Sequence, residues 1–346
     1  MRKIILLMCV AAVVLASCGQ SNENIFDAPV EYGLAQKSLS LSGEKLNIND
    51  SRQIQIISLF VSDSTLFLKG NENDSPYKFH TYSLENESEK GDFVAKGRAD
   101  NEMLSPIFGG FVQNDPYHIY LFDLNLCASY LFDYRKSVET NNTVLSKLVK
   151  LPARTLYAYP MDKGHIAIVP EEDDYVCEIL DENGKQIRKF SLYPHVSGMQ
   201  YFSELSSSFV VNQKQKKLAI AMCRVPQVNI LNLDSGDKVT TAVSPEYMEW
   251  NKLINEDMTK SRDYYSSSTQ SSKYFMALYR GGLTTKEQME GTKNLHLHVF
   301  DWDGNFIYDI SLSERLRAIA LDESSKTLYG VDTFDNIYKY DMSGVL

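Results

Sequence analysis

The chain has 346 residues, of which 45 are acidic and 35 are basic, and its formal net charge is −10. This balance argues against nucleic-acid binding, which requires clustered cations. Hydrophobic residues make up 43% of the chain and the charges are dispersed, so the composition excludes a disordered protein. The 21 tyrosines are typical of a fold with many half-buried strands.

The N-terminus has the pattern of an export signal. Arg2 and Lys3 precede an apolar stretch, Ile4–Leu15, that is shorter than the roughly 20 residues of a membrane-spanning helix. The run Leu15-Ala16-Ser17-Cys18-Gly19 resembles a bacterial lipobox, and an ordinary secretory signal is the alternative. We expect residues 1–17 to be removed and Cys18 to carry a lipid that attaches the protein to a membrane. Residues 18–31 are then a flexible tether.

Residues 32–346 consist of short apolar strands separated by turn residues, and a four-strand unit recurs six times. An acidic residue marks the third turn of each unit, at intervals of 40 to 67 residues: Glu85, Asp133, Asp181, Asp234, Asp301 and Asp341. The expected first strands are Ile54–Val61, Pro106–Val112, Leu156–Met161, Ser208–Val211, Asp263–Ser267 and Leu316–Leu321. This pattern predicts an all-β, six-bladed β-propeller with four-stranded blades. Five or seven blades, an open β-sandwich and two smaller β-domains are the alternatives.

The last unit ends at Leu346 without a fourth strand. The unassigned strand Lys37–Ser42, which can extend to Leu46, is able to supply it and so close the ring and cover both sheet edges. On this interpretation the tether and the C-terminus emerge side by side.

One stretch, Ser244–Lys260, has helical character. Ser244 can cap a helix, Pro245 suits its first position, and apolar residues follow at helical spacing. We expect a helical insertion that packs on the propeller, with a lid or partner-docking element as the alternative.

Cysteine and histidine patterns indicate no metal site and no cofactor. The cysteines that remain after export, Cys127, Cys177 and Cys223, are odd in number and lie in apolar patterns, so we expect three small buried hydrophobes. His296 and His298 point to one face of a strand, a spacing that can chelate a metal. Since no third ligand is evident, a solvent-facing pair on an outer strand is expected.

Candidate binding residues lie on the face that carries the loops between second and third strands. Arg224 and Arg280 end the second strands of their units, and Arg98, Arg154 and Arg315 fall in loops on the same face. A ring of guanidinium groups can bind carboxylate or phosphate, whereas pairing with neighbouring acids is the structural alternative. The candidate ligand-binding residues are Arg98, Arg154, His195, Arg224, Tyr279 and Arg280.

The acidic run Glu171–Asp174 is expected to be a solvated turn, with calcium binding as the alternative. The sequence contains no Gly-x-Ser-x-Gly elbow, His-Glu-x-x-His motif or P-loop. No catalytic residue is therefore assigned. A hydrolase or lyase with its site at the central channel stays open as an alternative, because paired carboxylates are brought together only by the fold.

The lipobox, the six units and the segments Tyr274–Gly282 and Leu297–Gly304 together resemble the TolB-like six-bladed propeller lipoproteins of Bacteroides and relatives. The resemblance implies a six-bladed fold and a lipid-anchored place in the cell envelope, at the outer membrane. The resemblance implies no catalytic residue in this chain. We expect a non-catalytic binding or scaffolding module for a protein, peptide or glycan.

Overall fold

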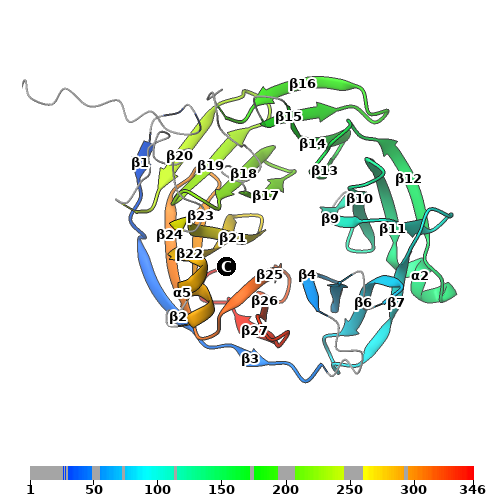
Figure 1. Cartoon of the computed structure of the whole chain (residues 1–346), viewed down its shortest axis with the longest axis horizontal. Helices are drawn as coiled ribbons and strands as arrows, with labels where there is room; N and C mark the ends of the chain where they lie inside the picture. The colour runs from blue at the N-terminus through cyan, green and yellow to red at the C-terminus, as the bar shows by residue number, and fades with distance from the viewer. Residues whose placement is uncertain are drawn as a thin grey trace, which may run out of the picture.

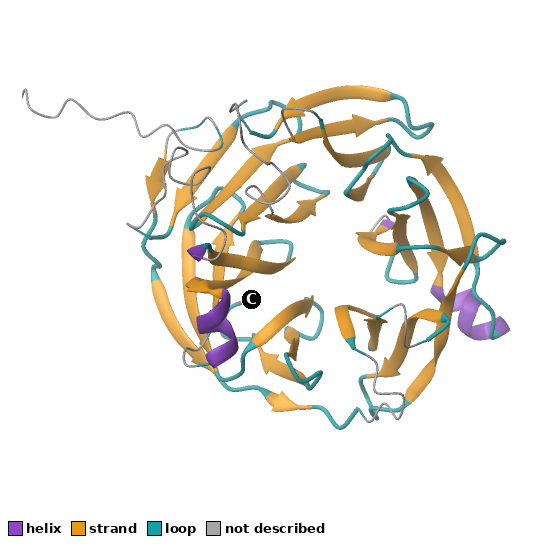
Figure 2. Ribbon diagram, viewed as in Figure 1, coloured by secondary structure: helices purple, strands orange, loops and turns teal. Residues whose placement is uncertain are grey.

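The computed structural model describes residues 26, 28, 30–48, 55–71, 75–112, 115–171, 175–193, 207–244, 260–291 and 295–346. Six sheets stand in a ring around a central axis, and the chain passes around the ring once (Figure 1). The predicted all-β, six-bladed propeller is confirmed. Within the described ranges, helix is confined to short segments on the periphery and on one face (Figure 2).

Every blade has four antiparallel strands in sequence order from the inside outward, except that the last blade borrows its outer strand from the N-terminus. Blade 1 contains β4 (Ile56–Ser62), β5 (Thr65–Gly70), β6 (Tyr77–Ser83) and β7 (Glu89–Lys96), with β8 (Glu102–Met103) at its edge. Blade 2 contains β9 (Pro106–Phe111), β10 (His118–Asp123), β11 (Ala128–Asp133) and β12 (Leu145–Lys150). Blade 3 contains β13 (Tyr157–Met161), β14 (Gly164–Pro170), β15 (Tyr175–Leu180) and β16 (Gln186–Ser191).

Blades 4 to 6 complete the ring. Blade 4 contains β17 (Ser207–Asn212), β18 (Lys217–Met222), β19 (Gln227–Asn232) and β20 (Lys238–Ala242). Blade 5 contains β21 (Arg262–Gln270), β22 (Tyr274–Thr284), β23 (His296–Asp301) and β24 (Phe306–Leu312). Blade 6 contains β25 (Leu316–Asp322), β26 (Thr327–Asp332) and β27 (Ile337–Asp341).

The strand sequences follow from how the blades pack. A central strand is covered on both faces by neighbouring blades, so β14 and β15 are apolar and buried along nearly their whole length. The outer strand β16 is polar and exposed because it forms the rim of the ring. The acids that marked the repeats shape turns: Oδ1 of Asp181 accepts bonds from the backbone N–H groups of Asn183 and Lys185, both at 2.9 Å.

The N-terminal segment completes blade 6, but the strand that does so is shorter and lies further along the chain than expected. The strand that completes blade 6 is β3 (Glu44–Lys45), which pairs with β27, whereas β2 (Lys37–Leu41) runs parallel to β24 of blade 5. A further strand, β1 (Val30–Tyr32), runs parallel to β20 of blade 4. The predicted completion of the last blade by an N-terminal strand is confirmed, through the extension toward Leu46. Lys37–Leu41 itself pairs with blade 5 instead, because an exposed Ser-Leu-Ser-Leu pattern fits any outer edge equally well.

The three N-terminal strands form a belt, residues 30–45, around the outside of blades 4, 5 and 6 (Figure 1). The chain consequently enters the propeller at blade 4, while Val345 packs in the core beside Tyr340 of blade 6. The expectation that the tether and the C-terminus emerge side by side was wrong. Phe26, inside the expected tether, is fully buried and its ring meets that of Tyr193 edge-on.

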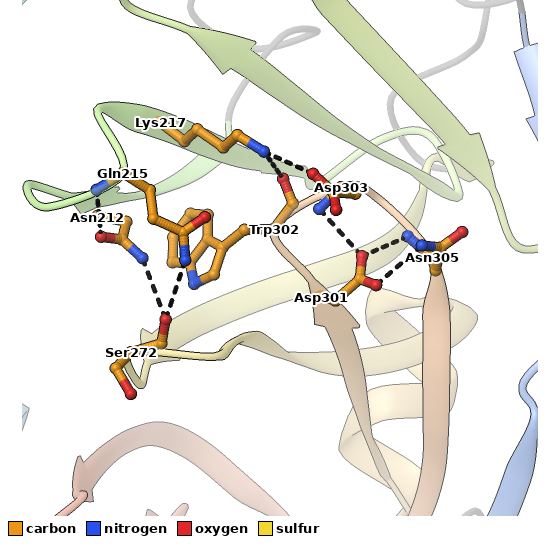
Figure 3. A network of polar contacts seen from close by, with 8 residues as sticks. All are labelled: Asn212, Gln215, Lys217, Ser272, Asp301, Trp302, Asp303 and Asn305. Carbon is orange, nitrogen blue, oxygen red and sulfur yellow. Dashed lines mark hydrogen bonds and ion pairs between the residues drawn. The ribbon is translucent and has the colours of Figure 1, made fainter.

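A polar joint connects the turns of blades 4 and 5 (Figure 3). Lys217 donates to the carbonyl oxygen of Trp302 and to Oδ1 of Asp303, both at 2.7 Å. The side-chain amides of Asn212 and Gln215 donate to the carbonyl oxygen of Ser272 at 3.4 and 3.1 Å. These bonds fix the two blades against one another beside the buried Trp302 ring.

Two short helices were not anticipated. Helix α2 (Tyr134–Thr140) begins at Asp133, whose side chain accepts a bond from the backbone N–H of Lys136. Helix α5 (Thr285–Glu290) lies in the loop between β22 and β23. Both helices are too short to show helical periodicity in the sequence. The expected helical insertion, Ser244–Lys260, falls almost entirely outside the described residues.

Of the three cysteines, Cys177 is buried as expected, but Cys127 and Cys223 are only partly buried. Both lie just beyond an apolar strand end, where the backbone turns, and so are less covered than a strand interior. Within the ranges that the structure describes, no helix is long and apolar enough to cross a bilayer.

Candidate functional site

Three of the five arginines predicted on one face come from consecutive blades. Arg224 follows β18 of blade 4, Arg280 lies in β22 of blade 5, and Arg315 precedes β25 of blade 6. Contacts with the residues of helix α5 and strand β21 bring these three together, as described below. The belt braces the same three blades from outside (Figure 1).

Two other predicted residues, Arg98 and Arg154, do not join this group. Arg98 is exposed in the segment between β7 and β8 of blade 1. Arg154 is exposed between blades 2 and 3; burial raises the pKa of Tyr175 to about 12, and the nearby charge of Arg154 opposes that rise. His195 lies outside the described residues. The chain therefore forms a cluster over blades 4 to 6 rather than a complete ring of arginines.

The local sequence after Arg280 builds the support for this cluster. Gly281 and Gly282 both have positive φ, 67° and 69°, a conformation that side chains rarely adopt. A Cβ atom on Gly282 would also lie 2.9 Å from the ring of Tyr264. The two glycines turn β22 away from β23 and lead it into α5, which a Thr284–Glu287 capping box starts.

Gln288 of α5 links the members of the cluster to one another. Its Oε1 accepts a hydrogen bond from Arg280, and its backbone carbonyl oxygen accepts one from Nη2 of Arg315 at 2.9 Å. Its Nε2 donates to Oδ2 of Asp263 at 2.7 Å. A single glutamine thus holds two guanidinium groups and one carboxylate.

Asp263 extends the network to blade 4. Its Oδ1 accepts a bond from Nη1 of Arg224 at 2.6 Å, and Sγ of Cys223 lies 3.5 Å from the same oxygen. Burial, with the Asp263 charge next in size, raises the pKa of the Cys223 thiol to about 12. The thiol is therefore protonated at neutral pH and acts as a weak donor, not as a nucleophile.

The charge of the cluster is unbalanced. Arg224 is paired with Asp263, but among the described residues the hydrogen-bond partner of Arg280 and Arg315 is the uncharged Gln288. Burial lowers the pKa of Arg280, Asp263 opposes this, and the charge of Arg315 lowers it further. Two guanidinium groups that repel one another beside a neutral amide create a place where an anion would be stabilised.

Tyr279 lies beside the cluster in a stack of rings. Its ring stacks on that of His298 with centroids 4.0 Å apart, and the Tyr265 hydroxyl lies 3.0 Å from Nδ1 of His298. Burial lowers the pKa of His298 to about 3, so this ring is neutral. Nδ1 of His296 lies 2.6 Å from Oδ1 of Asp309.

The expectation of a solvent-facing histidine pair was wrong for His298. Both rings point to one face of β23, as predicted, but that face packs against aromatic residues of the blade 4–blade 5 interface. Only His296, at the strand end, is partly exposed. Of the acidic run, only Glu171 is among the described residues, where it pairs with Lys189 of the outer strand β16, so the expectation of a solvated turn stays a prediction.

Comparison with known proteins identifies the family of this fold. The model of the TolB-like 6-blade propeller-like family matches residues 56–324. The chain belongs to this family. No curated protein matches the sequence.

Two solved structures resemble this TolB-like propeller over most of their length. One is a putative exported protein of Bacteroides fragilis, 11% identical, with 87% of this chain and 94% of that chain covered and a TM-score of 0.54. The other is a member of the DUF4221 family from Bacteroides vulgatus, 10% identical, with 90% and 97% covered and a TM-score of 0.53. At these identities the likeness shows the fold alone.

Sequence reasoning missed Asp263 and Gln288 of this TolB-like chain as site residues. A signal for α5 was present, because Thr284-x-x-Glu287 directly after a glycine doublet indicates a helix start. Recognising that helix would have placed Gln288 in the helix that directly follows the strand of Arg280. The pairing of Arg224 with Asp263 spans two blades and has no local signal.

Proposed function

We propose that this protein is a lipid-anchored propeller of the cell envelope that acts as a non-catalytic binding or scaffolding module for a protein, peptide or glycan. Its binding site is the cluster of Arg224, Arg280 and Arg315 with Asp263 and Gln288. The ligand presents a carboxylate or phosphate to Arg280 and Arg315.

The observation that carries the proposal is the bridging of two guanidinium groups by Gln288. An arginine that serves only stability is normally paired with a carboxylate, as Arg224 is. Here the protein keeps two arginines close together, one of them largely buried, and supplies a neutral acceptor. Such a group is oriented in advance, so an incoming anion loses little free energy to ordering of the side chains.

The proposed location in the cell envelope is supported by the sequence around Cys18 and by one similar solved structure. The Leu15–Gly19 run fits lipidation of Cys18, and the similar structure from B. fragilis is described as a putative exported protein. Acyl chains contribute roughly 0.8 kcal/mol per buried methylene, and more than one chain gives stable attachment. We infer an outer-membrane location for the lipid.

The test is affinity capture of partners from cell-envelope extracts with the full lipidated protein. We compare the wild type with the double variant Arg280→Gln/Arg315→Gln, and with Lys286→Gln, which removes a charge from the exposed side of the same helix. A partner bound reproducibly by the wild type and by Lys286→Gln, but lost by the double variant, supports the proposal. A partner retained by all three proteins, or no reproducible partner, contradicts it.

A further inference from the structure

Large apolar side chains stand exposed on both sides of the arginine cluster. Met289 follows Gln288 on α5 and is 83% exposed. Phe334, in the loop between β26 and β27 of blade 6, is also 83% exposed. Ile57 of the innermost strand of blade 1 is 49% exposed. A single exposed apolar side chain is ordinary on a protein surface, so what matters here is that three of them are grouped around one cationic cluster.

Hydrogen bonds of neighbouring residues connect these side chains to the arginines. Asp335 accepts a bond from Arg317, two residues after Arg315, and its Oδ1 also accepts one from the backbone N–H of Ile56 at 2.9 Å. Phe334 and Ile57 are the chain neighbours of Asp335 and Ile56. On the other side, the carbonyl oxygen bound by Arg315 belongs to Gln288, the neighbour of Met289. Along this chain of contacts, Arg315 and Arg317 come between Gln288, the neighbour of Met289, and the pair Asp335 and Ile56, the neighbours of Phe334 and Ile57.

The loop that carries Phe334 is rigidly held. Asp332 accepts bonds from the backbone N–H groups of Phe334 at 2.8 Å and Asn336 at 2.9 Å, and from the Asn336 side chain at 2.9 Å. Asp335 has a φ of 65°, fixed by its bonds to Arg317 and Ile56. The ring is thus presented to solvent by an ordered backbone, and its immobilisation on binding costs little entropy.

We propose that the ligand of this site is an extended acidic peptide, whose carboxylate binds Arg280 and Arg315 and whose large apolar side chains pack on Phe334 and Met289. The inference rests on the proposed function of the arginine cluster and narrows its ligand to one class. An alternating apolar, acidic, apolar segment matches the order of groups across this face. A free phosphate would use only the arginines, and an acidic glycan has no aliphatic groups for Met289 and Ile57.

The probe is a series of fluorescein-labelled nonapeptides with a central glutamate and leucines one to four residues away on each side, in a Gly/Ser background. Binding to the full chain is measured by fluorescence polarisation. We expect at least one spacing to bind, and about tenfold weaker binding when the leucines become alanine, when the glutamate becomes glutamine, or in Phe334→Ala. Ile187→Ala, which truncates an exposed side chain on the outer strand of blade 3, is the matched control.

The possible outcomes distinguish failure of the peptide proposal from failure of the proposed anion-binding site. If Arg280→Gln/Arg315→Gln abolishes binding but Phe334→Ala and the leucine-to-alanine peptides bind as before, the apolar contacts are refuted and the anion site stands. If oligogalacturonate binds and no peptide does, the peptide inference fails in favour of a glycan. If peptides bind equally to the double arginine variant, both proposals fail. Circular dichroism of each variant confirms that the comparison is between folded proteins.

Discussion

Nε2 of Gln288 donates a hydrogen bond to Oδ2 of Asp263 at 2.7 Å, and this bond fastens helix α5 to the first strand of blade 5. The same glutamine orients Arg280 and Arg315, so the position of the helix decides the geometry of the arginines. One uncharged residue therefore organises the arginine cluster, through its side chain for Arg280 and through its backbone carbonyl for Arg315.

Replacing Gln288 with leucine should weaken anion binding more than it weakens the fold. The change removes the acceptor of Arg280 and the donor to Asp263, which lets these two groups pair directly and neutralise each other. We expect phosphate binding, measured by isothermal titration calorimetry, to fall about tenfold, a loss of about 1.4 kcal/mol. Gln186→Leu, on the exposed strand β16, should bind like the wild type. Equal affinity of both variants would refute the bridging role.

Ring closure by the belt makes Gly43 sensitive to substitution. A Cβ atom there would lie 2.7 Å from the ring of the buried Tyr340, next to the strand β3 that completes blade 6. We expect Gly43→Ala to lower the free energy of unfolding by about 1–3 kcal/mol in urea denaturation, as overpacking does. At Gly344 an added Cβ meets nothing within 4 Å, so Gly344→Ala should change stability by less than about 0.5 kcal/mol. Similar small effects of both would argue against closure through β3.

The joint between blades 4 and 5 distinguishes two adjacent lysines. Lys217 is mostly buried and donates to Trp302 and Asp303, whereas Lys216 forms an exposed ion pair with Asp234. Because a lost bond leaves the Trp302 carbonyl less satisfied, Lys217→Met should cost about 1–2 kcal/mol of unfolding free energy. Lys216→Met should cost less than about 0.5 kcal/mol, since exposed ion pairs contribute little. The opposite order in thermal or urea unfolding would contradict the joint in Figure 3.

Because His298 is buried and neutral, we expect the free energy of unfolding to fall in mild acid. Its pKa is depressed to about 3 by burial, while an unfolded chain has a histidine pKa near 6.5, so the unfolded state binds the proton first. The stability that the neutral ring contributes is complete above about pH 6.5 and declines as the pH falls toward 3, by at most about 1.4 kcal/mol per unit. His298→Phe should flatten this decline between pH 6.5 and 5. Parallel profiles for wild type and His298→Phe would contradict the assignment.

Lipidation is tested separately from binding. Cys18→Ser should abolish incorporation of an alkyne-tagged fatty acid and release the protein from the membrane fraction. Unchanged labelling would show that the sequence Leu15–Gly19 is not a lipobox.

The sequence was sufficient to predict the ring and most of its strands, because a blade strand must satisfy packing on both faces and therefore shows a strong apolar pattern. It was insufficient for the belt, since exposed outer edges impose no register on β2 and its alternating serines and leucines suit several partners. Arg224 and Arg280 were found because they occupy equivalent places in the sequence repeat, although Arg224 follows its strand and β22 continues past Arg280 to Thr284. Gln288 was missed because a glutamine has no distinctive pattern, and its role comes from the helix that places it between two blades.

The central claim is that Arg280 and Arg315 together hold an anion. The most direct measurement is anomalous diffraction from crystals of the protein soaked in selenate, a tetrahedral dianion that scatters anomalously. The account predicts an anomalous peak within hydrogen-bonding distance of both guanidinium groups, and its loss in Arg280→Gln/Arg315→Gln. Both arginines paired with carboxylates of the chain, with no anomalous peak between them, would contradict it.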